Sequence, residues 1–377
     1  MNPLLRPCWL LALLALCLPA PSFAASATKA LQTLRSVGPE GKDNAKATAA
    51  WQDLLARADA RSLPDILEAM DDASPVALNW LRSAVDVIAA RELAAGKSLP
   101  IATLEKFLGK KSHHPRARRL AYELIAQAEP DRAKKLIAGM LDDPSTELRR
   151  DAVERVLVEA RQMAKSARKD QSLTQYSIAL KAARDIDQIE AIAKAMKELG
   201  QPVKLQEVFG WLSDWKVIGP FDNTGGAGFE RVFPPEQQID FQAEYDGKTG
   251  KVRWQSLTTT NEYGLVDFNK PIAALKGVTG YACTTVTSSK ERTVELRLGS
   301  KNGWKVWLNG KFLFGRDEYH RAAEIDQYRL KADLKRGANV ILVKVCQNEQ
   351  KEDWTKEWEF QLRITDDVGT PIDLAQR

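Results

Sequence analysis

The sequence predicts two structural halves, an α-helical repeat solenoid followed by an antiparallel β-sandwich of the jelly-roll type. Between residues 25 and 207, apolar residues recur every three or four positions in a chain rich in Ala, Leu, Arg and Glu, which is typical of packed helices. From residue 208 to 377, apolar and polar residues alternate and Gly, Asn, Asp and Pro mark frequent turns, which is typical of strands. Residues 1–24 have the composition of an export signal.

The export signal is predicted from three features of residues 1–24. Arg6 supplies a positive charge, Trp9–Leu18 is apolar, and Ser22–Ala24 places small residues where a signal peptidase needs them, so we expect cleavage after Ala24. The apolar run is shorter than the roughly 20 residues that span a bilayer, and no later segment is long and uncharged enough. We therefore expect an exported protein without a transmembrane segment, periplasmic or extracellular. Lipidation of Cys17 is disfavoured, because a large residue precedes it.

The charge balance disfavours nucleic acid as a partner. The chain has 55 basic and 50 acidic residues, a net charge of +5. Removing residues 1–24 takes away only Arg6, so the remaining chain keeps a mild net charge of +4. A nucleic-acid binder usually has a strongly basic surface.

The helical half contains three copies of one pattern, an apolar helix, a polar or proline-containing break and a second helix. The breaks lie at 72–75, 113–115 and 143–144, and the copies recur about every 30 to 40 residues. After the last break, Ser145 or Thr146 is the expected N-cap of a helix. One helix pair cannot bury its apolar face alone, so stacking into a solenoid is expected. The pattern resembles HEAT or armadillo-like repeats; an irregular helical bundle is the alternative.

About ten strands are expected in the second half. Asn309-Gly310 is the strongest signal, because a two-residue type I′ hairpin needs positive φ at both positions. Many short strands without helices between them favour a sandwich or jelly roll. The expected strands are Trp215–Ile218, Val252–Leu257, Leu265–Phe268, Gly280–Ser288, Arg292–Leu298, Lys305–Leu308, Lys311–Phe314, Gln327–Leu330, Asn339–Gln347 and Trp358–Thr365.

Four stretches of this half, at 215–221, 281–286, 298–311 and 334–345, resemble galactose-binding-like jelly rolls. Such domains are similar to the sugar-binding domain of family-two glycoside hydrolases and are common in exported bacterial proteins. The resemblance covers most of residues 211 to 370 and implies the fold more specifically than the ligand, because the fold also serves as a spacer or interaction module.

The resemblance bears on metal and disulfide sites. Some related domains hold calcium on acidic loop residues, but here the corresponding turn reads Lys301-Asn302, so no metal or other cofactor is predicted; Asp317, Glu318 and Asp326 are carboxylates on loops, typically solvated. The strands that carry Cys283 and Cys346 are central in the resembling fold, which makes these residues a candidate disulfide. The alternative is two buried free thiols.

No catalytic motif is present in the sequence. Outside the signal the histidines are His113, His114 and His320, and no zinc signature, nucleophile elbow or phosphate-binding loop occurs. A signal, a helical array and one sandwich account for the chain, so we expect no enzyme. A hydrolase with a carboxylate pair stays open, because such pairs meet only in three dimensions.

Loop and hairpin residues near the end of the expected sandwich are the candidate ligand site, because sugars are held by aromatic faces together with polar side chains. Trp307 is expected in the core instead. The candidate residues are Asn302, Trp304, Arg316, Asp317, Tyr319, His320, Trp354 and Trp358.

A second candidate is a basic segment of the helical half, which we expect either to contact a polyanion or to be an ordinary solvated turn and helix face. Its residues are Lys110, Lys111, Arg116, Arg118 and Arg119. Together these observations predict an exported, non-catalytic binding protein. The helical repeats would contact protein, and the sandwich would bind carbohydrate, another envelope protein or both. The alternatives are a scaffold protein of the cell envelope with no sugar site and, third, a carboxylate-dependent hydrolase.

Overall fold

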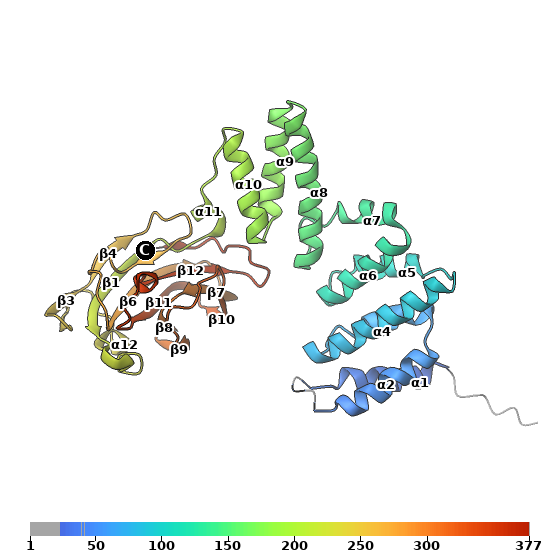
Figure 1. The fold of residues 1–377 in the computed structure, drawn as a ribbon, viewed down its shortest axis with the longest axis horizontal. Coiled ribbons are helices and arrows are strands. Elements are labelled where there is room, and N and C mark those ends of the chain that lie inside the picture. Colours follow the sequence, from blue (N-terminus) through green and yellow to red (C-terminus); the bar gives the residue numbers. More distant parts are fainter. Residues whose placement is uncertain (1–22, 39, 41, 377) are drawn as a thin grey trace, which may run out of the picture. The chain divides into compact units, whose positions relative to one another are not determined.

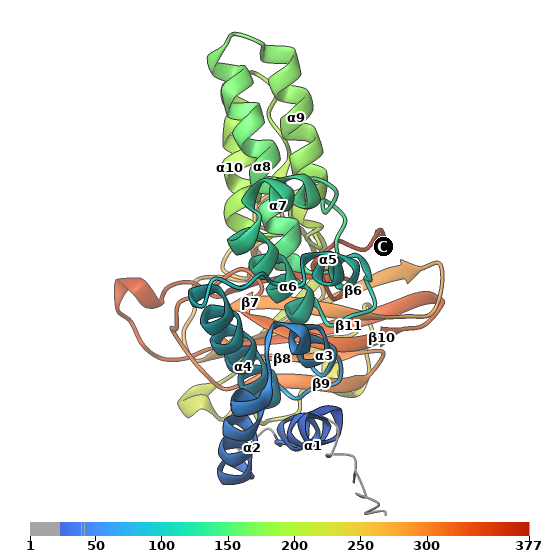
Figure 2. The same ribbon diagram turned by 90° about the vertical axis from the view of Figure 1, so that its right-hand side faces the viewer.

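A computed structural model describes residues 23–38, 40 and 42–376. The predicted export signal lies almost entirely outside these residues, so its cleavage stays a prediction. The chain forms helices first and antiparallel sheets afterwards, as the sequence predicts (Figures 1 and 2). It divides into two compact units, 1–148 and 149–377. The change from helix to strand falls between Phe209, where the last helix of the helical half ends, and Asp214, where the first strand begins; the border between the units lies earlier, inside the helix Thr146–Lys165.

The described part of the first unit is helical throughout. Helices α1 and α2 pack against each other and both contact α4, while α5 packs against α6 and α6 against α7. The elements are α1 (Phe23–Arg35), α2 (Asn44–Arg57), the 3-10 turn η1 (Ala60–Ser62), α3 (Leu63–Glu68), α4 (Pro75–Ala94), α5 (Ile101–Gly109), α6 (Pro115–Ala128), α7 (Pro130–Ile137) and the first turn of α8 (Thr146–Lys165).

The predicted breaks between helices are turns held together by acidic side chains. The Asp71 carboxylate lies 2.8 Å from Nδ1 of His113 and accepts the backbone N–H of His114. Asp143 forms a bidentate ion pair with Arg118 at 2.6 and 2.7 Å, and both side chains are only 1% exposed. The first carboxylate thus bonds its turn to the turn before α6, and the second bonds its turn back to α6. The structure confirms that helices flank these turns, as the sequence predicts. The assignment to HEAT repeats stays a prediction.

The second unit begins with the remainder of α8. Helices α9 (Lys169–Ala182) and α10 (Ile186–Glu198) pack against each other, and the short α11 (Leu205–Phe209) leads into the sheets. Arg150 on α8 forms a bidentate ion pair with Asp187 on α10. The Tyr263 hydroxyl donates to the Glu190 carboxylate at 2.8 Å. The last helices therefore belong to one compact body with the sheets.

The strands form two main antiparallel sheets and a short hairpin. In the described residues, one sheet has the order β4-β1-β6-β11-β8-β9 with β13 also on β6, the second has the order β10-β7-β12-β5, and β2 pairs with β3. The strands are β1 (Asp214–Asp222), β2 (Glu244–Asp246), β3 (Lys251–Arg253), β4 (Gln255–Thr258), β5 (Val266–Asp267), β6 (Val278–Ser288), β7 (Arg292–Ser300), β8 (Gly303–Leu308), β9 (Lys311–Arg316), β10 (Tyr328–Leu334), β11 (Gly337–Gln347), β12 (Glu359–Thr365) and β13 (Ala375–Gln376).

The two main sheets enclose one apolar core, to which both contribute aromatic and aliphatic side chains. The predicted hairpin is confirmed, since Asn309 and Gly310 both have positive φ between β8 and β9. The outer face of the larger sheet carries a second apolar cluster, which includes Trp307 and Tyr281. Lys344 is fully buried beside this cluster and donates to two carbonyls of the segment 229–231 and to Glu236. These bonds hold that segment against the sheet.

Candidate functional site

One end of the sandwich brings most of the predicted ligand residues together. There β7 ends and β8 begins around the turn 301–302, β9 ends at the loop 317–327, and β11 ends at the loop 348–358, which contains the 3-10 turn η3 (Asp353–Thr355). Hydrogen bonds join these segments to one another: the turn to the loop after β11, and that loop to the loop after β9. We call this region the loop end.

Three of the predicted ligand residues are structural instead, and this corrects their assignment. Asn302 is 1% exposed, and its side chain bonds Gln347 Oε1, the carbonyl of Glu357 and the N–H of Glu359. Trp304 and Trp358 are buried in the core between the sheets. Because strand side chains alternate between faces, an indole on the inner face cannot reach a ligand. The expected burial of Trp307 is confirmed, although it lies on the outer face of the larger sheet.

Trp354 is the most exposed large apolar side chain at the loop end, at 59%. Its indole meets the ring of His320 edge to face, with centroids 5.6 Å apart and an interplanar angle of 87°. A hydrogen bond fixes the His320 ring, because its Nε2 lies 2.6 Å from Oδ1 of Asn348. The backbone N–H of His320 also donates to the carbonyl of Lys301 at 2.5 Å. The exposed indole of Trp354 thus packs against an imidazole ring that hydrogen bonds hold in place.

A charged pair lies in the same segments. Lys301 and Glu357 are 3.3 Å apart, and each side chain is about one-third exposed. Oε2 of Glu357 is buried and accepts no hydrogen bond within the described residues. Burial alone would raise the pKa of Glu357, but its backbone N–H, the Lys301 ammonium and the charge of His320 lower that pKa overall. The carboxylate is therefore ionised and has one acceptor oxygen without a protein partner.

The remaining predicted residues lie beside this group. Tyr319 is partly buried, and its hydroxyl accepts a hydrogen bond from Nδ2 of Asn223 at 3.3 Å. Burial raises the pKa of Tyr319, and the neighbouring Asp317 contributes in the same direction. The ring packs where Gly303 has no side chain, since an added Cβ would lie 3.1 Å from it. Arg316 is exposed, with its guanidinium over the ring of Phe314.

The loop carboxylates that the sequence analysis described as typically solvated differ in their surroundings, and Asp326 is not solvated. Asp326 is buried and accepts hydrogen bonds from both Arg297 and Arg363. Glu318 lies 3.6 Å from Arg321. Among the described residues there is no group of three or more His, Cys, Asp or Glu side chains placed to hold a metal ion.

Cys283 and Cys346 are buried free thiols, so the candidate disulfide is wrong. The two residues lie on neighbouring strands, but Cys283 is opposite Leu342 and Cys346 is opposite Thr279. This register separates the thiols by four residues along the strands, about 13 Å, well beyond the roughly 7 Å limit for a disulfide. The Cys346 thiol instead lies 3.3 Å from the Thr279 hydroxyl.

The basic segment of the first unit does not form a uniform patch. Arg118 is buried against Asp143 and cannot contact a polyanion, which corrects its assignment. Lys111 pairs with Asp142 and Arg119 with Glu123, whereas Lys110 and Arg116 are exposed. His113 stacks on the ring of Phe107, and Nδ1 of His114 accepts the N–H of Arg116 at the start of α6. Both histidines therefore have structural roles in this turn.

Sequence reasoning did not single out four polar residues of the loop end: Asn223, Gln347, Asn348 and Glu357. Gln347 Nε2 donates to the carbonyls of Thr355 and Glu357 and so ties η3 to the end of β11. A signal was present, because Gln347-Asn348-Glu349-Gln350 follows the apolar run of a central strand directly. Polar residues at a strand end usually belong to the loop cluster there.

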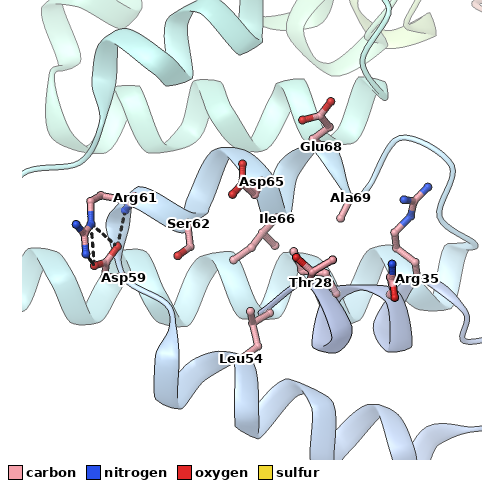
Figure 3. Close-up of a pocket in the computed structure, with 12 residues that line it drawn as sticks. Thr28, Arg35, Leu54, Asp59, Arg61, Ser62, Asp65, Ile66, Glu68 and Ala69 are labelled. Carbon is pink, nitrogen blue, oxygen red and sulfur yellow. Dashed lines mark hydrogen bonds and ion pairs between the residues drawn. The ribbon is translucent and has the colours of Figure 1, made fainter. Parts of the chain in front are cut away.

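The first unit contains a hollow of about 740 Å³ between α1, α2, η1 and α3 (Figure 3). Leu54, Ile66 and Ala69 line its apolar part. Asp59 and Arg61, joined by an ion pair at 2.6 Å, lie on its rim. The sequence did not predict this hollow, and its mixed charges favour no particular ligand.

Comparisons with known proteins establish no family. No protein-family model and no curated protein matches the sequence. A PA14 sugar-binding domain from an RTX adhesin is 13% identical over 44% of this chain and 96% of that domain, with a TM-score of 0.26. A GH31 α-xylosidase from Xanthomonas citri is 12% identical over 30% of this chain and 15% of the enzyme, with a TM-score of 0.17.

A third similar structure is the alkylpurine DNA glycosylase AlkC of Pseudomonas fluorescens bound to DNA with an abasic site analog. It is 11% identical over 94% of this chain and 90% of the enzyme, with a TM-score of 0.19. TM-scores this low do not establish a shared fold. Within the described residues, no helix has the length and apolar character needed to cross a bilayer.

Proposed function

We propose that the β-sandwich is a galactose-binding-like domain that binds carbohydrate at the loop end, without catalysing a reaction. The observation that carries the proposal is the exposed indole of Trp354 held edge to face against His320. A pyranose ring has an apolar C–H face and a rim of hydroxyls. An exposed indole supplies a large, rigid apolar surface for the C–H face, and nearby polar groups can form hydrogen bonds with the hydroxyls.

The polar groups beside Trp354 fit the hydroxyl rim. The Glu357 side chain is 39% exposed beside the Lys301 ammonium, so its exposed part can accept a hydrogen bond from a sugar hydroxyl directly or through a water. The Lys301 ammonium is about one-third exposed and can donate. His320 and Asn348 act as positioning residues, since they hold the indole rather than present free groups.

We also propose that the protein works outside the cytoplasm and that its helical half contacts another envelope protein. The first part rests on the signal-like composition of residues 1–24. The mass of the protein isolated from its native host tests it, because export predicts a chain that begins at Ala25. The scaffold and hydrolase alternatives make different predictions in the binding experiment below.

The binding experiment uses the full chain and affinity gel electrophoresis against xylan, laminarin, alginate and peptidoglycan. We expect retardation by at least one polymer and about tenfold weaker binding by Trp354→Ala, which corresponds to about 1.4 kcal/mol. Phe312→Ala is the matched control, because Phe312 is a comparably exposed aromatic residue, at 51%, on the edge strand β9. That variant should bind as the unmodified protein does.

Three outcomes contradict the proposal. Absence of binding by a protein shown to be folded would favour the scaffold alternative. Equal binding by Trp354→Ala and the unmodified protein would move the site away from the loop end. Release of reducing sugar from a bound polymer would show a hydrolase.

A further inference from the structure

The second unit contains a hollow of about 460 Å³ that the proposed function does not use. It lies between α9, α10 and the turn 369–371 that follows β12. Its walls are mainly apolar, with Leu180, Ile189, Met196 and Val208 from the helical side and Pro371 from the turn. Small-molecule sites in proteins are typically hollows of about 300–1,000 Å³ with apolar walls and a few polar groups.

The charged side chains that line this hollow are all basic: Lys181, Arg184 and Arg363. Arg363 already has an ion-pair partner, because it donates to both oxygens of the buried Asp326. Lys181 is exposed to solvent. Arg184 differs from these two residues, because its guanidinium is partly buried among apolar side chains.

Arg184 is fixed in place but makes no ion pair within the described residues. Its Nε donates to the Thr370 hydroxyl at 3.0 Å, and its Nη1 donates to the carbonyls of Lys181 and Ala183. Asp366 is the nearby carboxylate that acts on it, but Oδ1 of Asp366 accepts the N–H groups of Val368 and Thr370 and so holds the turn. The guanidinium therefore has bonds to neutral groups only.

The electrostatic surroundings of Arg184 favour an added negative charge. Burial lowers the pKa of Arg184, and the positive charges of Arg149 and Arg363 act in the same direction, whereas the Asp366 carboxylate acts against them without bonding the guanidinium; the pKa is lowered overall. A partly buried guanidinium is best compensated by a carboxylate, and Nη2 of Arg184 is the nitrogen left to donate to one, because Nε and Nη1 already have acceptors.

We propose that this hollow binds a monocarboxylate with an apolar chain, of the fatty-acid type. The chain would occupy the space between Leu180, Met196 and Pro371, and the carboxylate would pair with Arg184. A strongly hydrated polyanion fits less well, because the apolar walls would desolvate its further charges without pairing them.

The test uses the full chain with dansyl-undecanoate as a fluorescent probe, displaced by decanoate or by decanol, which has the same chain without the charge. We expect decanoate to displace the probe at about tenfold lower concentration than decanol. Arg184→Met should remove this preference, and Arg184→Lys should retain part of it. Arg168→Met is the matched control, because Arg168 is an exposed arginine just before α9 and does not line the hollow.

A second variant guards against a loss of folding in Arg184→Met. Leu180→Trp fills the hollow and keeps the guanidinium, so it should weaken the probe and both competitors. The proposal is overturned if the unmodified protein does not bind the probe, if decanol competes as well as decanoate, or if Leu180→Trp binds the probe unchanged. Unchanged selectivity in a folded Arg184→Met protein also overturns it.

Discussion

Replacing Asp326 by Ala should destabilise the second unit more than other single carboxylate changes there. Asp326 is 8% exposed and joins two strands, β7 through Arg297 at 2.7 Å and β12 through Arg363 at 2.5 and 2.7 Å. Arg297 keeps a second carboxylate, Glu295, but Arg363 would keep no carboxylate partner among the described residues, with the carbonyl of Phe209 and the rings of Phe209 and Trp211 as its remaining contacts. Removing one partner of a buried ion pair costs about 3–5 kcal/mol, because the remaining charge is left uncompensated.

For a unit of this size, each kcal/mol lowers the melting temperature by about 2–4 °C, so a decrease on the order of 10 °C is expected. Thermal unfolding followed by tryptophan fluorescence reports it, because Trp215, Trp304 and Trp358 are buried in the core between the sheets. Asp353→Ala is the control. That residue is almost fully exposed in its pair with Lys356, and its replacement should leave the melting temperature unchanged.

The pH dependence of the same difference gives a second test. Burial alone would raise the pKa of Asp326, but hydrogen bonds and charges from Arg363 and Arg297 lower it below its ordinary value. A lowered folded-state pKa stabilises above the unfolded value of about 3.9, and the stabilisation is lost as pH falls through the folded-state value. The two proteins should therefore converge in stability in strong acid. A difference below about 1 kcal/mol at neutral pH would refute the reasoning.

Three further predictions concern buried or strained positions. Burial raises the pKa of the Cys283 thiol to about 12 and that of Cys346 to about 11, so neither should react with a thiol reagent at neutral pH until the protein is unfolded. Asp71→Ala removes two bonds to the next turn and should destabilise the first unit by about 1–3 kcal/mol, measured by far-ultraviolet circular dichroism in urea. Gly210→Ala should lower the melting temperature of the second unit, because φ is +69° and the new Cβ would lie 2.6 Å from Pro371.

The sequence predicted the order of the secondary structure because its periodicities are local signals. The helix after residue 145 begins at Thr146, and Oγ of Ser145 accepts the N–H of Leu148 at 3.5 Å, as expected for a cap. Every predicted strand overlaps an observed one. The predicted strand Val252–Leu257 is two strands, β3 and β4, which pair with different partners. Pairing partners lie far apart in the chain, so local pattern does not determine them.

The site was predicted less well, because exposure depends on pairing register. Trp304 and Trp354 both stand near polar residues in the sequence, yet one is 1% and the other 59% exposed. The difference arises because Trp304 lies on the inner face of β8, whereas Trp354 lies in a turn beyond the strands. Register also separates Cys283 from Cys346, although their strands are neighbours. The hollow beside Arg184 is lined by segments as far apart in the chain as Ser177 and Pro371, and these segments share no sequence motif.

The long central strand β6 has a consequence for the folding kinetics of the chain. It pairs with β1, which precedes it by many residues, and with β11 and β13, which follow it much later. Non-local pairings of this kind slow folding, because a long loop must close before any contact is gained, whereas helix pairs such as α5 and α6 form from neighbouring segments. Refolding should therefore show a fast phase in helical ellipticity and a slower phase as the core tryptophans become buried. During that interval the apolar strands are exposed, so aggregation should compete with formation of the sandwich rather than with formation of the helices.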